Sequence, residues 1–389
     1  VLVNWDLRID KLMENQVYRD WLRDIGGEKV YFSTGKKWSA NLEKAVRELE
    51  KLEAQELMRF ADPESSKIVL DYMNALPVNP FKKVVEANFD AAWLEISKLS
   101  NSSVDKNGKP CRSKRFVNIE ILDSIREQPL PQYKVSQKGN TVRVFPSNLS
   151  ILLLARDVRK KLCKGWWEAD LRSSQLAIAA KVWQIPEVED FLKQGGSIWA
   201  ELFNYYNLSH LVKGSKEYER IKGALKDNLY SVLYGAARFT IVSDLDQRLG
   251  EGYGKLFFKH PLIKILFKAR SKKIDEFNQK GHIKSIFGKA IRISGEKNSK
   301  GDPTPTRMAS IRSALAQEAQ AIELWVMLPL IDLAKSTSDF QITLWQHDGV
   351  SINFTNHTKR DRWIKRMQEV IANRAEELGA VTELEMVEL

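Results

Sequence analysis

The sequence predicts a helix-rich α/β fold with a short strand that ends on one aspartate and a β-hairpin that turns at another. Long segments place apolar residues at helical spacing among charged ones, as at 41–60. Residues 165–170, GWWEAD, are typical of a short strand that ends on a carboxylate just before a helix. Residues 340–354, FQITLWQHDGVSINF, alternate in polarity on both sides of an Asp348-Gly349 turn, which predicts a β-hairpin.

Length, charge and cysteine content limit the classes of partner and the cellular compartment that we expect for the protein. The 389 residues suffice for two or three subdomains, and 61 Lys and Arg against 50 Asp and Glu give a net charge of +11. This excess favours a polyanionic partner such as nucleic acid. Cys111 and Cys163 form neither a metal-binding spacing nor a disulfide framework, so we expect a reducing, cytoplasmic compartment. The longest apolar runs, such as 151–155, are too short to cross a bilayer, and no membrane partner is expected.

The N-terminal quarter, to about residue 100, reads as helices separated by prolines. A polar segment at 101–115 follows and is expected to be a loop. It is either an ordinary solvated loop or a loop that binds the phosphate backbone of a nucleic acid. Its basic residues are Lys106, Lys109, Arg112, Lys114 and Arg115.

The first aspartate lies where a strand gives way to a helix. Asp170 ends the strand at 165–170, and Ser173 or Ser174 is expected to cap the helix that follows. A carboxylate at this point is well placed to bind a metal ion, although a simple turn or capping role would place the same residue there.

A central helix is expected at 216–239. Lys222, Lys226, Tyr230 and Tyr234 recur every four residues, which aligns them on one helical face. Ammonium groups suit a polyphosphate, and phenol rings suit a stacked base. Gly235 would let a template strand pass close to the backbone. The alternative is an ordinary amphipathic helix with Lys outside and Tyr at its boundary.

The C-terminal part is expected to contain a basic helix at 253–277 and a hairpin at 282–293 that turns near Gly288. One long helix at 306–334 carries Arg312 and Gln317. His347 and Asp348 should lie at the tip of the second hairpin, unless Asp348 serves only to form the turn. A helix at 359–378 and a strand at 382–389 complete the chain.

Taken in order, the strand with Asp170, the Lys/Tyr helix and the hairpin with His347-Asp348 resemble the three polymerase motifs of family A DNA polymerases. They are also similar to those of the single-subunit, phage-type RNA polymerases. The resemblance covers about residues 143–389 and implies a right-hand polymerase. Its thumb and the N-terminal part of the palm would occupy 1–164, the palm with the first motif 165–180, the fingers 181–280, and the rest of the palm 281–389.

The resemblance implies a role for each residue of the three motifs. Nucleotidyl transfer uses two divalent ions, here Mg²⁺ with Mn²⁺ as an alternative, and Asp170, Asp348 and the carbonyl of Leu171 would hold them. Lys226 would neutralise the leaving phosphates and give a proton to pyrophosphate, while Lys222 would contact a phosphate. Tyr230 would flank the incoming sugar and base. Tyr234 would stack at the template-primer junction.

The resemblance also implies contacts with primer-template nucleic acid. The residues expected to make them are Arg143, Gly235, Arg312, Gln317 and His347, together with Lys109, Arg112, Lys114 and Arg115 of the basic segment.

Two departures bear on the choice of sugar. DNA polymerases of the family have a Glu five residues after the first Asp, as a wall against a ribose 2′-hydroxyl. An ungapped count places Gln175 there, and a count shifted by two residues places Ala177 there. The third motif reads HDG, so Gly349 stands where those enzymes have a further Glu.

We therefore expect a template-directed DNA polymerase that lacks a proofreading exonuclease and acts as a monomer on primer-template and nucleoside triphosphates, with replisome accessory proteins as further candidate partners. An RNA polymerase or primase-like enzyme with relaxed sugar selection is the first alternative. A catalytically silent nucleic-acid-binding protein and a basic helical protein with chance motif matches are the others. The expected compartment is the cytoplasm, or the host cytoplasm for a viral protein.

Overall fold

The computed structural model describes residues 64–101, 103–104, 110–136, 141–346 and 349–389. The chain divides into a unit at 1–61 and a unit at 62–389, and every described residue belongs to the second. The helix expected at 41–60 lies outside the described residues, as do Lys106, Lys109, His347 and Asp348.

Helices and short strand pairs make up the first part of the second unit. The elements are α5 (Glu64–Asn74), α6 (Asn79–Ser97), β1 (Ser103–Val104), β2 (Pro110–Cys111), α7 (Lys114–Glu127), β3 (Tyr133–Val135), β4 (Val144–Pro146), a 3-10 turn (Ile151–Leu153) and α8 (Arg156–Leu162). The prediction of a loop throughout 101–115 is wrong at two places, because β1 and β2 form an antiparallel pair and α7 begins at Lys114. Ser113 caps α7 by accepting a hydrogen bond from the Phe116 N–H, so Lys114 and Arg115 belong to the helix.

The first motif and the segment after it contain one strand and seven helices within the described residues. They are β5 (Trp167–Leu171), α9 (Ser174–Val182), α10 (Pro186–Lys193), α11 (Ile198–Tyr205), α12 (Lys216–Leu233), α13 (Arg238–Leu249), α14 (Tyr253–Phe257) and α15 (Pro261–Lys280). The central helix ends at Leu233, earlier than expected, because Gly235 adopts a φ of +80° that stops the helix. The basic helix expected at 253–277 is two helices, because Pro261 starts α15 anew.

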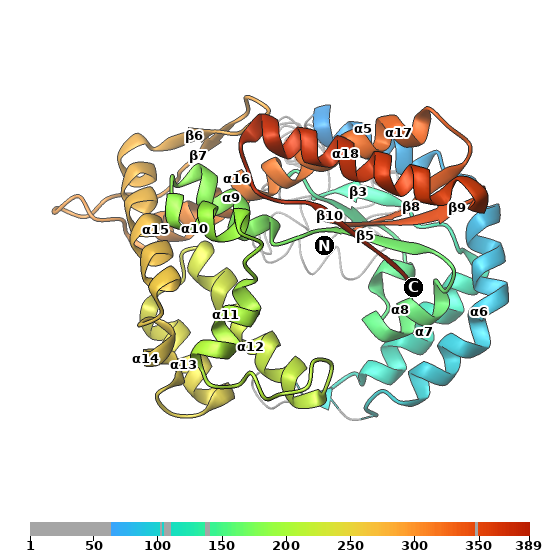
Figure 1. Ribbon diagram of the computed structural model, residues 1–389, viewed down its shortest axis with the longest axis horizontal. Coiled ribbons are helices and arrows are strands. Elements are labelled where there is room, and N and C mark those ends of the chain that lie inside the picture. Colours follow the sequence, from blue (N-terminus) through green and yellow to red (C-terminus); the bar gives the residue numbers. More distant parts are fainter. Residues whose placement is uncertain (1–63, 102, 105–109, 137–140, 347–348) are drawn as a thin grey trace, which may run out of the picture. The chain divides into compact units, whose positions relative to one another are not determined.

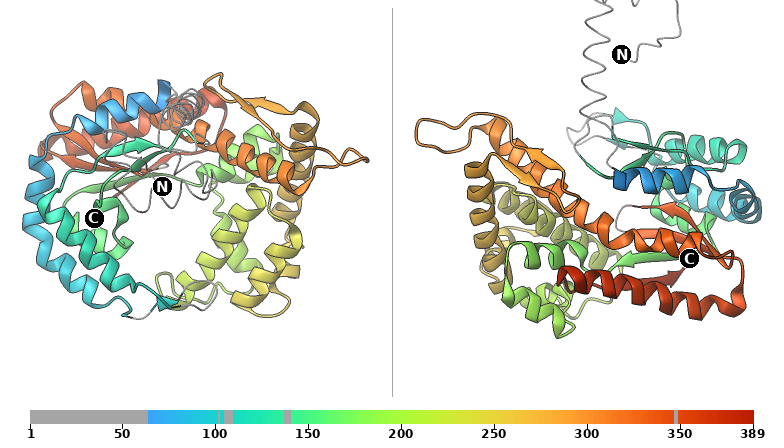
Figure 2. Two further views of the ribbon diagram at one scale, coloured as in Figure 1. Left: turned by 180° about the vertical axis from the view of Figure 1, so that it is seen from behind. Right: turned by 90° about the horizontal axis from the view of Figure 1, so that it is seen from above.

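The remaining elements are β6 (His282–Lys284), β7 (Ala290–Arg292), α16 (Pro305–Met327), α17 (Pro329–Lys335), β8 (Phe340–Trp345), β9 (Gly349–Phe354), a 3-10 turn (His357–Lys359), α18 (Arg360–Leu378) and β10 (Leu384–Glu388). Both predicted hairpins form as antiparallel pairs, and Figure 2 shows the β6–β7 hairpin beside α16. The prediction of one continuous helix at 306–334 is wrong. The segment divides at Pro329, which cannot donate a helical hydrogen bond.

A four-stranded antiparallel sheet holds the first and third motifs together. Its order is β10-β5-β9-β8, so β5 and β9 are the two central strands, and helix α18 packs along β10 (Figure 1). Ala169, Val350 and Ile352 are fully buried in a core shared with α6, α8 and α16–α18. Their burial fixes the register, because a slip by one residue would turn these apolar side chains to the opposite face of the sheet.

A second apolar core surrounds α12. Leu225, Leu229 and Val232 of α12 pack against α9–α11 and α13–α15. Helix α9 belongs to both cores, because Ile178 joins the sheet core and Leu176 joins the α12 core. The strand that carries Asp170 and the helix that carries the Lys/Tyr stripe are thereby connected through α9. Within the described residues, no helix has the length and apolar character needed to span a membrane.

Candidate active site

Asp170 occupies the position predicted for it, near the end of β5. It pairs across the sheet with Gly349, the first residue of β9, and its side chain is exposed. A β-carbon built on Gly349 would lie 3.1 Å from Oδ1 of Asp170 and 3.0 Å from the carbonyl oxygen of Ala169. The glycine of the HDG sequence therefore leaves the space that the Asp170 carboxylate occupies.

The Asp170 carboxylate and the Leu171 carbonyl are oxygen donors of the kind that divalent cations prefer. Leu171 follows in the same strand and pairs with Leu384, and Asp348 immediately precedes Gly349 in the chain. In the part of the chain that the structure describes, no group of three or more His, Cys, Asp or Glu side chains could hold a metal ion. A site of two carboxylates and one carbonyl needs only two such side chains.

Helix α12 carries the predicted stripe along the boundary between its buried and its exposed face, where Tyr230 packs against the edge of the α12 core. Lys226 is exposed, Lys222 and Tyr230 are half-buried, and Ile221, Leu225 and Leu229 pack inward. The Lys226 ammonium lies 5.4 Å from the centre of the Tyr230 ring, whose centre is 6.3 Å from that of Tyr234. The cation and both rings therefore form one continuous surface, and Tyr234 stands at the C-cap of the helix rather than within it.

A hydrogen bond joins this stripe to the first motif. The Tyr234 hydroxyl donates to Oε1 of Gln175 over 2.7 Å, and the Gln175 residue is 4% exposed. Among the described residues, the Gln175 Nε2 has no hydrogen-bond partner. Ala177, the residue given by the shifted count, is buried in the α12 core. Gln175, the residue given by the ungapped count, therefore contacts Tyr234, whereas Ala177 packs in the α12 core.

The turn after Tyr234 is held by two arginines. Arg312 Nε donates to the carbonyl of Gly235 over 2.9 Å, and Arg270 Nη1 donates to that of Ala236 over 2.7 Å. Burial, and then the charge of Arg312, lower the pKa of Arg270 to about 10. A β-carbon on Gly235 would lie 3.2 Å from Arg312 Cγ, so protein side chains fill the space beside this glycine. Its positive φ and this crowding are reasons for glycine here that do not involve a template strand.

Several other residues predicted to contact nucleic acid have hydrogen-bond or ion-pair partners inside the protein. Gln317 Nε2 donates to the Ser313 hydroxyl, one turn earlier in α16. Arg112 pairs with Glu120, and Arg115 donates to backbone carbonyls, including that of Leu99 over 3.1 Å. Of the described basic side chains at 110–115, Arg112 has an ion pair and Arg115 has hydrogen bonds, whereas exposed Lys114 has neither. Its ammonium group is therefore the best placed of the three for an external phosphate.

Glu323, which the sequence analysis did not single out, contacts the start of the helix that follows the first motif. Ser174 does not cap α9 as predicted. Its hydroxyl instead donates to Oε1 of Glu323 over 2.9 Å, while Ser173 precedes α9 in a left-handed conformation (φ 52°) with no capping hydrogen bond from its side chain. Glu323 is 1% exposed and also accepts a hydrogen bond from Arg143. A lone Glu within the apolar run AIELWVML was the available signal for a buried, paired carboxylate.

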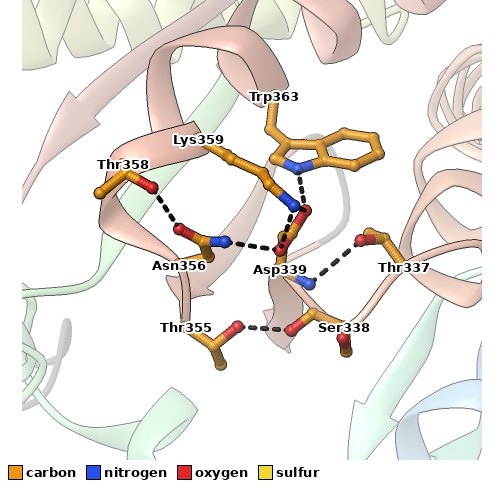
Figure 3. Close-up of polar contacts among 8 residues, drawn as sticks. All are labelled: Thr337, Ser338, Asp339, Thr355, Asn356, Thr358, Lys359 and Trp363. Atoms are coloured by element: carbon orange, nitrogen blue, oxygen red, sulfur yellow. Dashed lines mark hydrogen bonds and ion pairs between the residues drawn. The ribbon is translucent and has the colours of Figure 1, made fainter.

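Asp339 fixes the end of the β8–β9 hairpin that is remote from residues 347–348. As Figure 3 shows, its carboxylate accepts hydrogen bonds from the Trp363 indole N–H over 3.0 Å and from Asn356 over 2.9 Å, and it pairs with Lys359. The Trp363 bond, followed by those from Asn356 and Lys359, lowers the pKa of Asp339 to about 2. These contacts join the start of β8 to the segment after β9, which stabilises the register of both strands.

The fold is similar to that of a known DNA polymerase domain. No protein-family model matches the sequence, and no curated protein does so either. Among solved structures, the chain is similar to the POL domain of Pol1 from M. smegmatis, solved in complex with DNA primer-template and dNTP. The TM-score is 0.54 at 13% sequence identity, and the match covers 87% of this chain and 65% of that chain. The helix-rich α/β chain, with its antiparallel sheet, therefore has a polymerase-like fold.

Proposed function

We propose that this chain is a template-directed DNA polymerase of the family A type, with the right-hand division into thumb, palm and fingers expected from its sequence. The observation that carries the proposal is the pairing of Asp170 with Gly349 in the two central strands. This register brings the first motif next to the residue that follows Asp348. The likeness to a polymerase domain solved with primer-template and dNTP supports the same conclusion.

Asp170, Asp348 and the Leu171 carbonyl would hold two Mg²⁺ ions, with Mn²⁺ as an alternative. When bound, the ions supply the charge that activates the primer 3′-hydroxyl and stabilises the leaving pyrophosphate. Lys226 would bind the triphosphate through its exposed ammonium group and protonate the leaving group. Lys222 would contact a second phosphate as a point charge, without the planar fork of an arginine.

The two tyrosines would bind the nucleotide and the template-primer junction. Tyr230 lies between Lys226 and Tyr234 and is half-buried at the edge of α12, where it can flank the incoming sugar and base. Tyr234 is held by Gln175 at one end and by the arginine-clamped turn at the other, so its ring is oriented for stacking. Primer-template would also contact Arg143, Arg312, Gln317, His347 and the basic segment near Lys114.

One observation supports a relaxed choice of sugar as a second candidate property. Because Tyr234 occupies Oε1 of Gln175, the buried Nε2 is left without a partner among the described residues, and a shift of this side chain would present its N–H to a ribose 2′-hydroxyl. An RNA polymerase or primase-like activity would use the same feature. Incorporation of dNTPs and rNTPs compared on one template distinguishes these activities.

Primer extension in Mg²⁺ by the wild type, Asp170→Asn and Asp348→Asn tests the proposal. Each variant should lose extension while it retains primer-template binding, since only the proposed metal ligands change. A wild-type protein that binds primer-template but never extends it would point instead to a silent nucleic-acid-binding protein. Extension by a variant at the wild-type rate would remove that aspartate from the metal site.

A further inference from the structure

Helix α16 carries a buried carboxylate that the proposed chemistry does not use. Glu323 is 1% exposed and lies between the buried residues Ile322 and Leu324. An ionised carboxylate removed from water is strongly destabilising unless it is paired and hydrogen-bonded. The contacts of this side chain therefore indicate what it holds in place.

The two carboxylate oxygens contact different parts of the chain. Oε2 accepts from Nη2 of Arg143 over 2.9 Å, and Oε1 accepts from the hydroxyl of Ser174 over 2.9 Å. Arg143 immediately precedes β4, and Ser174 is the first residue of α9. One buried group thus joins three elements that are far apart in the sequence.

Each of these contacts leads to a residue of the proposed reaction. Ser174 lies four residues after Asp170 and directly before Gln175, beyond the left-handed Ser173. A change at Ser174 would therefore shift both the Asp170 carboxylate and the Gln175 side-chain amide. Arg143 has a side chain that is 25% exposed, so its guanidinium can reach a ligand while Glu323 holds its other side.

We propose that Glu323 is a positioning residue that holds Arg143 against primer-template and, through Ser174, sets the strand-to-helix turn between Asp170 and Gln175. This inference rests on the proposed polymerase function. Two effects on function follow from one side chain. The Ser174 branch acts on nucleotide insertion, and the Arg143 branch acts on primer-template affinity.

Single variants separate the branches. Ser174→Ala should raise the KM for the nucleotide or lower kcat by about tenfold, the effect of one lost hydrogen bond to a charged group, with primer-template Kd unchanged. Arg143→Met should weaken primer-template binding with a smaller effect on insertion. Glu323→Gln, which keeps the shape and loses the charge, should show both defects.

A double variant distinguishes positioning from simple stabilisation. Replacing both partners of a buried ion pair with apolar residues of similar size often restores stability. Arg143→Met combined with Glu323→Leu should therefore recover most of the Tm lost in Glu323→Leu alone. The insertion defect should persist, because Ser174 still lacks its acceptor.

Insertion by the double variant at the rate of Arg143→Met would refute the positioning role, as would a Glu323→Gln protein with wild-type kinetics. Both results require an active wild type. A wild type that does not extend primers under any condition would refute the proposed function instead, so the two failures are distinguishable.

Discussion

Replacing Gln175 by Glu should sharpen the preference for deoxyribonucleotides. In the folded chain, Gln175 accepts from the Tyr234 hydroxyl over 2.7 Å, and its Nε2 has no hydrogen-bond partner among the described residues. The substitution keeps the length of the side chain and the acceptor for Tyr234 but removes the donor. A ribose 2′-hydroxyl would then lose its partner, whereas a deoxyribose loses nothing.

The magnitude follows from that one hydrogen bond. A neutral hydrogen bond contributes about 1 kcal/mol, which corresponds to about fivefold in kcat/KM. The ratio of kcat/KM for dCTP over CTP opposite template G should therefore rise by about fivefold in Gln175→Glu. The wild type should exclude CTP less well than a polymerase that carries Glu at this position.

Ala177→Glu is the matched control. Ala177 is 1% exposed in the α12 core, so the added carboxylate has neither space nor water. This variant should lose Tm without a selective change in sugar preference. A dCTP/CTP ratio that Gln175→Glu leaves unmoved, or that Ala177→Glu raises in a stable protein, would refute the assignment of Gln175 to the sugar.

Three further outcomes are expected. Gly349→Ala should lower kcat by about ten- to a hundredfold with binding retained, because its β-carbon would crowd the Asp170 carboxylate; unchanged single-turnover kinetics would contradict this. Lys114→Gln should reduce the slope of log affinity for primer-template against log salt by about one, whereas Arg115→Gln should mainly lower Tm, and the reverse result would exchange their roles. The ionised Asp339 carboxylate stabilises the fold fully above its unfolded pKa near 3.8, and this stabilisation is lost as the pH falls towards 2. The Tm advantage of wild type over Asp339→Asn should therefore shrink across that interval. A constant Tm difference between pH 4 and pH 2 would argue against this role.

The sequence by itself predicted the features that depend on local pattern. Alternating polarity around Asp348-Gly349 predicted β8 and β9, and the segment GWWEAD at 165–170 predicted β5. The four-residue interval predicted that Lys222, Lys226 and Tyr230 lie along one side of α12. These features follow from side-chain periodicity, which depends only on neighbours in the chain. Helix ends were less predictable, because Pro261 and Pro329 divide segments whose apolar pattern continues across them.

Only the tertiary structure decided how these elements meet. The pairing of Asp170 with Gly349 depends on strand register, which is set by the burial of Ala169, Val350 and Ile352 on one face of the sheet. The contact of Gln175 with Tyr234, 59 residues away in the chain, depends on how α9 and α12 pack. The connection of Glu323 to Ser174 spans 149 residues and replaces the helix cap that local sequence predicted. The hydrogen-bond partners of a buried carboxylate are the donors that tertiary packing places beside it, so they cannot be predicted from the local sequence pattern.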